Sequence, residues 1–355
     1  MRALHVLETL AAGGVETTFL NVLRHFPAGT RGRADRHDVL ALRGGALETE
    51  YRAAAAHVYI QSPRAWGALL AEGDYDVIYV LFERAAVELL PRAAATSTAR
   101  IVYGKNYDFS GQWRSTEGFT WSTDDALMTA ADGVTFTTAA LAAAYRDNAS
   151  RGLVLGKAAD VSPLLTLPPA GADVPHRILA IANPTPRKRL GDLIEALARV
   201  KAAVPDAELR IIGHGDPAEV TRLCALAESL GLGASVTLPG GTRDVRAELA
   251  RARVVALSSA SEGVPTALLE GMAAARPIVT TDCGHVHSIV DDGVEGFVVP
   301  VGDVPALARR LTALLEAPDV ARAMGTRGRT RATPHAVESV AARLSAYLHD
   351  VAGAH

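Results

Sequence analysis

A chain of 355 residues is longer than one hydrophobic core usually supports, so two domains are expected. The net charge of −3 argues against nucleic-acid binding, and no run approaches the about 18 apolar residues of a membrane-spanning helix. The two cysteines, Cys224 and Cys283, stand far apart outside any CxxC pattern, which indicates neither a disulfide framework nor a zinc site. The opening apolar run is too short for a signal peptide, and we expect a soluble protein of the reducing cytoplasm.

The first half of the chain alternates strand-like apolar runs with helix-like segments, which is typical of a parallel sheet covered by helices. Helices are predicted over about 15–26 and from Ala139 onward. The predicted strands lie at 3–7, 38–42, 77–81, 100–103 and 131–138.

The turn between the first strand and the first helix holds Gly13, Gly14 and Glu16. Paired glycines allow a tight turn and the close approach of a ligand to the backbone. The spacing is not GxGxxG, which counts against a nicotinamide or flavin dinucleotide at this turn. A plain structural turn is the alternative interpretation.

Basic residues gather after the first predicted helix, between Arg24 and Arg43, with few acidic residues among them. One interpretation is a surface that faces an anionic membrane or acceptor, which would mean peripheral membrane contact. The other is a solvated loop between a helix and a strand, and we favour it.

The segment 163–176 contains four prolines and predicts a linker between two domains. Strands and helices alternate again after it, and the final helix is predicted over 335–351. The strands predicted in this half lie at 178–182, 208–212, 235–238, 253–258, 277–281 and 296–301. Ligands of such α/β domains bind at the carboxyl ends of the strands.

Arg187, Lys188 and Arg189 form a basic turn just before a predicted helix. Cations are disfavoured at this end of a helix because the helix dipole is positive there. A bound anion would resolve that conflict, and a solvated helix start is the alternative. The turn therefore predicts an anion site.

Two glutamates, Glu262 and Glu270, are separated by seven residues across a junction of loop and helix. Pro265 suits the first helical position, which places Glu262 in the loop and Glu270 about 7 to 8 Å further along the helix. Free backbone N–H groups before the helix would favour an anion. They belong to Gly263, Val264 and Thr266. Such a site suits a ligand that is rich in hydroxyls and carries phosphate, as a nucleotide sugar does, whereas two ordinary surface acids are the alternative.

This segment resembles the Glu-x7-Glu signature of the GT-B retaining glycosyltransferases, in particular glycosyltransferase family four, and the similarity continues over nearly all of the C-terminal half. The resemblance implies an α/β fold of two Rossmann-like domains with parallel sheets facing a central cleft. It places an acceptor-side domain at 1–162, a linker at 163–176 and a nucleotide-sugar-binding domain at 177–334. The final helix, 335–355, would pack back on the first domain.

The resemblance also assigns roles on the donor side. Glu262 would face the hydroxyls of the donor sugar, and Glu270 would hold the ribose hydroxyls. Lys188 matches the lysine of an Arg-x4-Lys diphosphate clamp, but Asn183 holds the arginine position, so a neighbouring arginine is expected to supply the charge. The predicted catalytic residues are Glu262, Lys188 and Arg187, with Arg189 as the other candidate cation. The remaining predicted donor-binding residues are Gly13, Gly14, Asn183, Gly213, Arg243, Gly263, Val264, Pro265 and Thr266.

The acceptor side departs from the family pattern. Family members often have a histidine after the strand at 100–103, and this chain has none there. Lys105, Asn106 or Asp108 would take its place. Glu16 completes a Gly-Gly-x-Glu loop that approaches the diphosphate and the acceptor in the family.

The resulting hypothesis is a retaining glycosyltransferase that moves a sugar from a nucleoside diphosphate to a hydroxyl of a small-molecule or glycan acceptor, such as a natural product, glycolipid or polysaccharide precursor. No cofactor or metal is expected, because Asp74 and Asp76 match Asp-x-Asp but precede a strand as a surface turn would. A GT-B sugar-nucleotide epimerase or phosphorylase is one alternative. A non-catalytic partner of a glycosyltransferase is another, suggested by Asn183 and the missing histidine.

Overall fold

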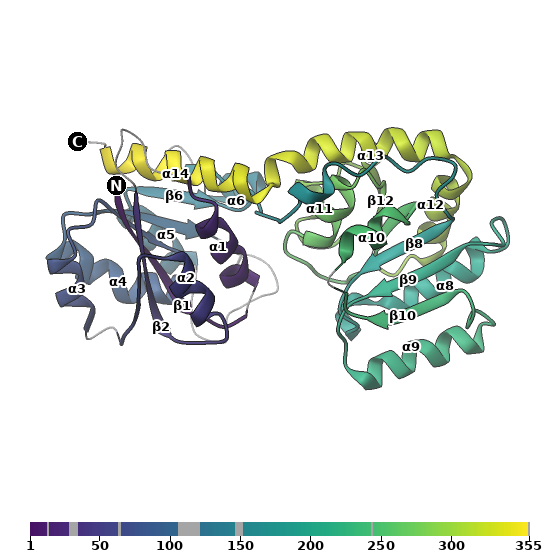
Figure 1. The fold of residues 1–355 in the computed structure, drawn as a ribbon, viewed down its shortest axis with the longest axis horizontal. Helices are drawn as coiled ribbons and strands as arrows, with labels where there is room; N and C mark the ends of the chain where they lie inside the picture. The colour runs from purple at the N-terminus through teal and green to yellow at the C-terminus, as the bar shows by residue number, and fades with distance from the viewer. Residues whose placement is uncertain are drawn as a thin grey trace. The chain divides into compact units, whose positions relative to one another are not determined.

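The computed structural model describes residues 1–12, 14–27, 35–62, 65–105, 121–145, 152–242 and 244–353. The chain forms two compact units (Figure 1). Unit 1 contains Met1–Ala158 together with Val337–His355, and unit 2 contains Ala159–Ala336. Each is built on a parallel sheet, so the predicted α/β fold is confirmed. Within the described ranges, no helix is both long and apolar enough to cross a bilayer.

Unit 1 has a seven-stranded sheet. Its strands are β1 (Arg2–Thr9), β2 (Arg36–Arg43), β3 (His57–Ile60), β4 (Val77–Val80), β5 (Arg100–Lys105), β6 (Gly133–Phe136) and β7 (Gly152–Val154). Their order is β3-β2-β1-β4-β5-β6-β7, and all neighbours are parallel. Because the order reverses between β1 and β4, the carboxyl ends of these strands flank the point where ligands bind in such sheets.

Helices cover both faces of this sheet. They are α1 (Gly14–Arg24), α2 (Glu48–Ala54), α3 (Trp66–Glu72), α4 (Glu83–Thr96), α5 (Trp121–Ala130), α6 (Ala139–Ala144) and α14 (Val337–Gly353). Successive side chains of a strand point to opposite faces. Leu4 and Val6 of β1 accordingly pack with α3, α4, α5 and α6, whereas Ala3 and Leu7 pack with α1, α2 and α14.

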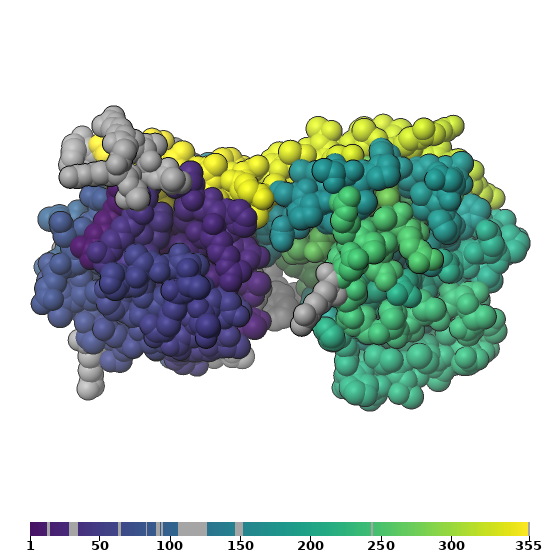
Figure 2. All heavy atoms as spheres, viewed as in Figure 1, coloured from purple at the N-terminus to yellow at the C-terminus, as the bar shows by residue number. Residues whose placement is uncertain are grey.

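The last helix, α14, belongs to unit 1. The Tyr347 hydroxyl accepts a hydrogen bond from the Val134 N–H (2.9 Å), and Arg343 donates to the Leu155 carbonyl (2.8 Å). Figure 2 shows the yellow atoms of α14 against the purple N-terminal atoms of the same unit. Helix α14 therefore packs in the same hydrophobic core as β1 and α1.

Unit 2 has a six-stranded parallel sheet. Its strands are β8 (Arg177–Ile181), β9 (Glu208–Ile212), β10 (Val236–Gly240), β11 (Val254–Leu257), β12 (Ile278–Thr281) and β13 (Gly296–Val299). The order is β10-β9-β8-β11-β12-β13, and it reverses between β8 and β11. The loops after these two strands carry the candidate site.

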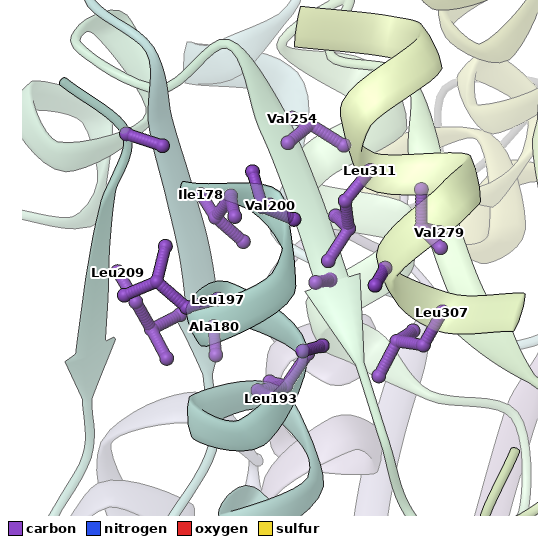
Figure 3. Close-up of a cluster of buried hydrophobic side chains, with 14 of the residues drawn as sticks. Ile178, Ala180, Leu193, Leu197, Val200, Leu209, Val254, Val279, Leu307 and Leu311 are labelled. Atoms are coloured by element: carbon purple, nitrogen blue, oxygen red, sulfur yellow. The ribbon is translucent and has the colours of Figure 1, made fainter. Parts of the chain in front are cut away.

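The helices of unit 2 are α8 (Leu190–Val200), α9 (Pro217–Ser229), α10 (Val245–Ala250), α11 (Thr266–Ala273), α12 (Val304–Glu316) and α13 (Pro318–Ala332). On one face of the sheet, Ile178 and Ala180 of β8 pack with Leu197 of α8 and Leu311 of α12 (Figure 3). On the other face, Leu179 packs with α10 and α11. The sheet is thus buried on both sides, as its continuous apolar strands require.

The proline-rich segment 163–176, which the sequence predicts as a linker, lies in unit 2 and is attached there by arginines from distant parts of the chain. The pairs are Arg246 with the carbonyl of Pro163, Arg329 with Leu167, Arg276 with Pro168, and Arg253 with Ala172 and Val174. In Figure 2 the teal atoms of this segment run along the yellow-green α13. Charged donors thus fix its carbonyl groups to the unit.

Unit 2 begins and ends at one place. The Ala159 N–H donates to the His335 carbonyl (2.9 Å), and Ala159 pairs with Ala336 in an isolated parallel bridge. The short 3-10 helix η5 (Thr333–His335) precedes this point. The whole of unit 2 is therefore one continuous stretch of chain whose two ends are in contact.

Candidate functional site

The basic turn after β8 has a special backbone conformation. Pro186–Lys188 forms the 3-10 helix η3, and Arg189 then adopts a left-handed conformation (φ 48°, ψ 38°) before α8 begins. Few residues other than glycine adopt this conformation. The Arg189 guanidinium pairs with Asp192 in the first turn of α8 (2.8 Å). The other two cations of the turn reach a different loop.

Lys188 and Arg187 meet Glu262 in the loop that follows β11. Lys188 Nζ lies 2.5 Å from Glu262 Oε1, and Arg187 Nη1 lies 3.4 Å from Glu262 Oε2. Arg187 also donates to the Ser261 carbonyl (2.5 Å). The structure thus brings together the three residues predicted to be catalytic, although 74 residues separate Lys188 from Glu262.

Two hydrogen bonds, one from a side chain and one from the backbone, join the loop after β11 to the turn after β8. The Ser258 hydroxyl donates to the Lys188 carbonyl (2.9 Å), and the Ala260 N–H donates to the Arg187 carbonyl (2.9 Å). Ser258 is fully buried. The position of the two cations relative to Glu262 is therefore set by the main chain as well as by their charges.

Ser259 orients the carboxylate of Glu262. Its hydroxyl donates to Glu262 Oε1 (2.7 Å), and its own carbonyl accepts from the Thr281 hydroxyl (2.7 Å). Oε1 therefore has two donors, Ser259 and Lys188, whereas Oε2 faces Arg187 at 3.4 Å. Sequence analysis missed Ser259, because a serine after a strand is typical of any turn.

The loop after β12 packs directly behind Glu262. Gly284 has a positive φ of 60°, and a Cβ there would lie 1.6 Å from the Glu262 carbonyl oxygen, so no other residue fits. The His285 N–H donates to the Gly263 carbonyl (3.2 Å). Burial raises the pKa of the neighbouring Cys283 thiol. The backbone at Glu262 is thus fixed from behind as well as by β11.

The helix α11 begins at Thr266, so Pro265 is the residue before the helix (φ −71°, ψ 113°) and not its first residue as expected. Among the described residues, none accepts a hydrogen bond from the backbone N–H of Gly263, Val264 or Thr266. Unpaired donors at the start of a helix favour an anion or a partly negative oxygen. The predicted donors are therefore available beside Glu262.

Glu270 lies half-buried in α11. Burial, and to a lesser degree the negative charge of Asp160, raises the pKa of Glu270 to about 7. At neutral pH the carboxyl is therefore close to its midpoint between the neutral and the charged form. Perturbed carboxyls of this kind are typical of sites that bind or transform a ligand.

Asn183 has a structural contact at the end of β8. Its Oδ1 accepts from the His214 N–H (3.0 Å) in the loop between β9 and α9. Gly213 precedes this contact, and a Cβ on it would lie 2.3 Å from the Ala182 carbonyl oxygen. Asn183 thus holds the loop after β9 and brings no charge, which leaves Arg187 as the second cation at Glu262. Arg243, predicted on the same side, lies outside the described residues.

Unit 1 holds the remaining predicted residues after β1 and β5. Gly14 starts α1, and Glu16 is buried in its first turn, where burial raises the pKa of the Glu16 carboxyl. The Tyr51 hydroxyl donates to the Glu16 carbonyl (2.7 Å). Lys105 ends β5 and is fully buried, with Nζ 5.7 Å from the centre of the Tyr145 ring. Outside the described residues lie Gly13, Asn106 and Asp108.

The Asp-x-Asp sequence before β4 takes part in the fold of unit 1. Asp76 accepts from the Arg2 N–H (2.6 Å), and the Tyr75 hydroxyl donates to Asp38 (3.0 Å). Across the described parts of the chain, no group of three or more His, Cys, Asp and Glu residues is suited to hold a metal ion.

Comparison with known sequences finds a family match that lies within the second unit. Residues 172–331 match the family model described as Glycosyl transferases group 1. The putative glycosyltransferase EpsD of Bacillus subtilis (strain 168) is 36% identical over 165 residues, which cover 45% of this chain and 43% of that protein. The putative colanic acid biosynthesis glycosyltransferase WcaL of Escherichia coli (strain K12) is 36% identical over 147 residues, 39% of this chain and 36% of that protein. The chain therefore spans less than half the length of these curated relatives.

Solved structures share the fold over nearly the whole chain. A glycosyltransferase from Rickettsia africae ESF-5 superposes with a TM-score of 0.82 at 16% identity, covering 100% of this chain and 99% of that one. Anabaena HepE in complex with UDP gives a TM-score of 0.80 at 19% identity, covering 99% and 100%. HepE in complex with UDP-glucose gives 0.70 at 20% identity, covering 98% of each. The likeness shows the GT-B fold of two Rossmann-like units.

Proposed function

We propose that this chain, whose second unit is a glycosyl transferases group 1 domain, is a retaining glycosyltransferase that moves a sugar from a nucleoside diphosphate to an acceptor hydroxyl. The observation that carries the proposal is the contact of Lys188 and Arg187 with Glu262, beside N–H groups at the start of α11 that have no acceptor in the described part of the chain. This arrangement offers two cations, backbone donors and a carboxylate within one unit. A diphosphate joined to a sugar has the complementary groups.

The cations serve the leaving group. Departure of the nucleoside diphosphate increases the negative charge on the bridging oxygen, so cations fixed beside it stabilise the transition state more than the bound donor. Lys188 fills the lysine position of the clamp, and Arg187 takes the charge that Asn183 does not supply. The N–H groups of Gly263, Val264 and Thr266 add neutral donors.

The two carboxylates recognise hydroxyl groups on either side of the diphosphate. Glu262, in the loop, would accept hydrogen bonds from the donor sugar, and Glu270, in α11, from the ribose. A hydroxyl donor stabilises the charged form of a carboxyl, so nucleotide binding would lower the raised pKa of Glu270. Gly213 and Arg243 complete the donor side in this proposal.

Transfer would proceed with attack by the acceptor on the face that the leaving group vacates, through an oxocarbenium-like state and without a resident metal or cofactor. The acceptor hydroxyl belongs to a glycan, glycolipid or other small molecule. Acceptor-side roles are proposed for Glu16 after β1 and for Lys105, Asn106 and Asp108 at the end of β5 and beyond it. Gly13 and Gly14, which follow β1 in the sequence, are proposed to approach the donor. Uridine diphosphate sugars are the first donors to test, since HepE, which shares the fold, has been solved with UDP and UDP-glucose.

The decisive experiment is a thermal-shift panel of UDP, GDP, ADP, CDP and TDP, followed by turnover with the sugars of the base that binds. A ligand at 100 times its Kd adds about 2.7 kcal/mol to the stability of the folded state. We expect one base to give a clear shift and its sugar donor to be consumed only when an acceptor hydroxyl is present. No shift with any base would overturn the proposal in favour of a non-catalytic partner, and consumption without an acceptor would indicate an epimerase or hydrolytic side activity.

A further inference from the structure

We propose that Glu262 is an internal substitute for the donor diphosphate. Without a donor, its carboxylate pairs with Lys188 and Arg187, and when a donor binds, these two cations pair with the diphosphate instead. The inference rests on the proposed function and deepens it, because it states how the same site distinguishes a sugar donor from its nucleoside diphosphate product. It concerns unit 2 alone.

The contacts of Lys188 and Arg187 with Glu262 are those of an occupied anion site. Lys188 Nζ is 2.5 Å from Oε1, Arg187 Nη1 is 3.4 Å from Oε2, and the Lys188 and Glu262 side chains are only 16% and 11% exposed. A charge pair with this little solvent around it attracts more strongly than one at the surface. An incoming diphosphate must therefore draw the two cations away from Glu262 before it can bind them.

The carboxylate stays in place when the cations leave. Ser259 donates to Glu262 Oε1 (2.7 Å) independently of Lys188, and the fit of Gly284 against the Glu262 carbonyl fixes the backbone. Glu262 would then stand unpaired on its cationic side, which is costly for a carboxylate with so little exposure. Hydroxyl groups of a donor sugar can replace the lost partners.

A sugar donor and a nucleoside diphosphate therefore differ in how many of the separated groups they provide with new partners. The donor supplies phosphate to the cations and hydroxyls to Glu262, so every displaced group regains a partner. The nucleoside diphosphate supplies only phosphate and leaves the Glu262 carboxylate without its cations. Competition by Glu262 thus weakens binding of the product more than binding of the donor, and it assists product release.

The test is calorimetric measurement of Kd for UDP and for UDP-glucose, or for the matching pair of whichever base the panel identifies, with wild type and with Glu262→Gln. The amide has the shape of the carboxylate but no charge to hold the cations. We expect the variant to bind the nucleoside diphosphate about five- to tenfold more tightly, the range of a modest coupling free energy. Affinity for the sugar donor should gain less or fall, so the preference for the donor over the product decreases.

Three further variants separate competition from other causes. Glu195→Gln removes one negative charge from the exposed side of α8 without touching the cluster, and its Kd values should stay within about twofold of wild type. Ser259→Ala removes a partner of Glu262 and leaves the ion pair, so it should not tighten product binding. In a double-mutant cycle, Glu262→Gln should increase the affinity for the nucleoside diphosphate less in a Lys188→Gln background, because one of the two cations that Glu262 shares with the diphosphate is gone.

The outcomes distinguish this inference from the proposed function. Wild type that binds nucleoside diphosphate, with Glu262→Gln binding it no more tightly, overturns the substitute role and leaves the glycosyltransferase proposal standing. An equal gain in Glu195→Gln does the same, because it assigns the effect to general charge. Wild type that binds neither ligand overturns both.

Discussion

At the scale of single residues, the burial of Glu270 should make the affinity for a nucleotide depend on pH. Its carboxyl has a pKa raised to about 7 by burial, so at pH 6 most molecules carry the neutral form. In the proposed function, ribose hydroxyls donate to the ionised form, and the affinity for a nucleoside diphosphate should therefore weaken as pH falls from 8 to 6. Calorimetry across this range should show that affinity depends more steeply on pH in wild type than in Glu270→Gln. The variant also controls for titration of the ligand itself, and two equal slopes would contradict the proposed role of Glu270.

The same carboxyl gives a prediction for stability. The folded state binds the proton with a pKa of about 7 and the unfolded state with an ordinary value near 4.5, so the folded state holds more protons between these two pH values. Stability from this group therefore falls as pH rises from about 4.5 to 7. Glu270→Gln removes the burial of a charge and should raise the Tm of unit 2 by about a few degrees at pH 8. At pH 4, where both states of wild type are protonated, the variant should show no such gain.

The two arginines of the basic turn should have unequal effects. Arg187 reaches Glu262, whereas Arg189 is paired with Asp192 on its own helix. We expect Arg187→Ala to lower kcat/KM by about 100-fold, the scale of one lost transition-state charge contact. Arg189→Gly removes an equal charge two residues away and suits the left-handed backbone, so its kcat/KM should stay within about threefold. Equal losses would mean that the turn acts through its total charge.

Sequence alone predicted the acidic and basic residues of this site and missed the residues that position them. Glu262 and Lys188 stand in local patterns that a motif reveals. The roles of Ser259 and Gly284 depend on contacts with Glu262 that form only in the folded chain, and neither residue stands in a local pattern that predicts its role. The sequence names Arg187 with Arg189 as the other candidate, and it cannot separate them because the direction of each side chain depends on the turn, in which Arg189 itself is left-handed.

At the scale of elements, the segment 163–176 shows what local composition misses. Four prolines and a glycine typify a linker, and the segment is instead bound along its length by four arginines. The hydrogen bonds join residues that are 79 to 162 positions apart in the sequence, so no short window of the sequence displays the contacts. Prolines also leave fewer backbone donors, and carbonyl acceptors dominate such a stretch.

Two members of this set, Arg253 and Arg276, are buried, and we expect Arg276 to contribute most to stability. Arg276 is 1% exposed and donates to the carbonyls of Pro168 and Leu249, and burial lowers its pKa to about 10. Arg276→Met leaves both acceptors unpaired and should lower the free energy of unfolding by about 2 to 4 kcal/mol in urea titration. Arg246→Ala, at an exposed member of the same set, should cost less than about 1 kcal/mol. A larger loss in Arg246→Ala would place the main attachment at the start of the segment.

The strands that sequence analysis missed in unit 1 are its two edges. β3 and β7 each pair on one side only and are short, and Gly152–Val154 has just three residues. Central strands such as β4 are buried on both faces and give a continuous apolar run, which an edge strand does not need. Periodicity therefore predicts the middle of a sheet better than its margins.

At the scale of the whole molecule, the two units should respond differently to acid. In unit 1, His5 Nε2 lies 2.9 Å from His37 Nδ1, and Phe26 stacks on both rings. His5 is fully buried, and His37 and Phe26 are partly buried. Burial lowers the pKa of His5 well below its ordinary value and that of His37 to about 4. The unfolded chain thus binds more protons between pH 6.5 and 4, and unit 1 loses stability as pH falls through that range.

Tryptophan fluorescence can follow this loss in unit 1 alone, because Trp66, Trp113 and Trp121 all belong to it. Between pH 7.5 and 5, protonation of His37 in the unfolded state should remove about 2 kcal/mol from the stability of unit 1. The fluorescence-detected Tm should therefore fall further than the remaining transition seen by circular dichroism. Equal shifts of both transitions would contradict a special role for the histidine pair.

The α/β class and the parallel sheets followed from the sequence because strand and helix patterns repeat in both halves. The strand orders did not follow from it, since they depend on which strands pair across connections of many residues. The same limit applies to the path of the chain, which passes from unit 1 into unit 2 and returns for α14.

That path gives the chain the form of an exchangeable cassette. The Ala159 N–H donates to the His335 carbonyl, so the two ends of 159–336 lie side by side. A related domain with the same spacing between its ends could therefore replace this one at two adjacent junctions. Recombination between genes of this architecture would replace one half of the machinery as a single piece and keep the other. Under the proposed function, two crossovers would then create new pairings of donor and acceptor without any change inside either hydrophobic core.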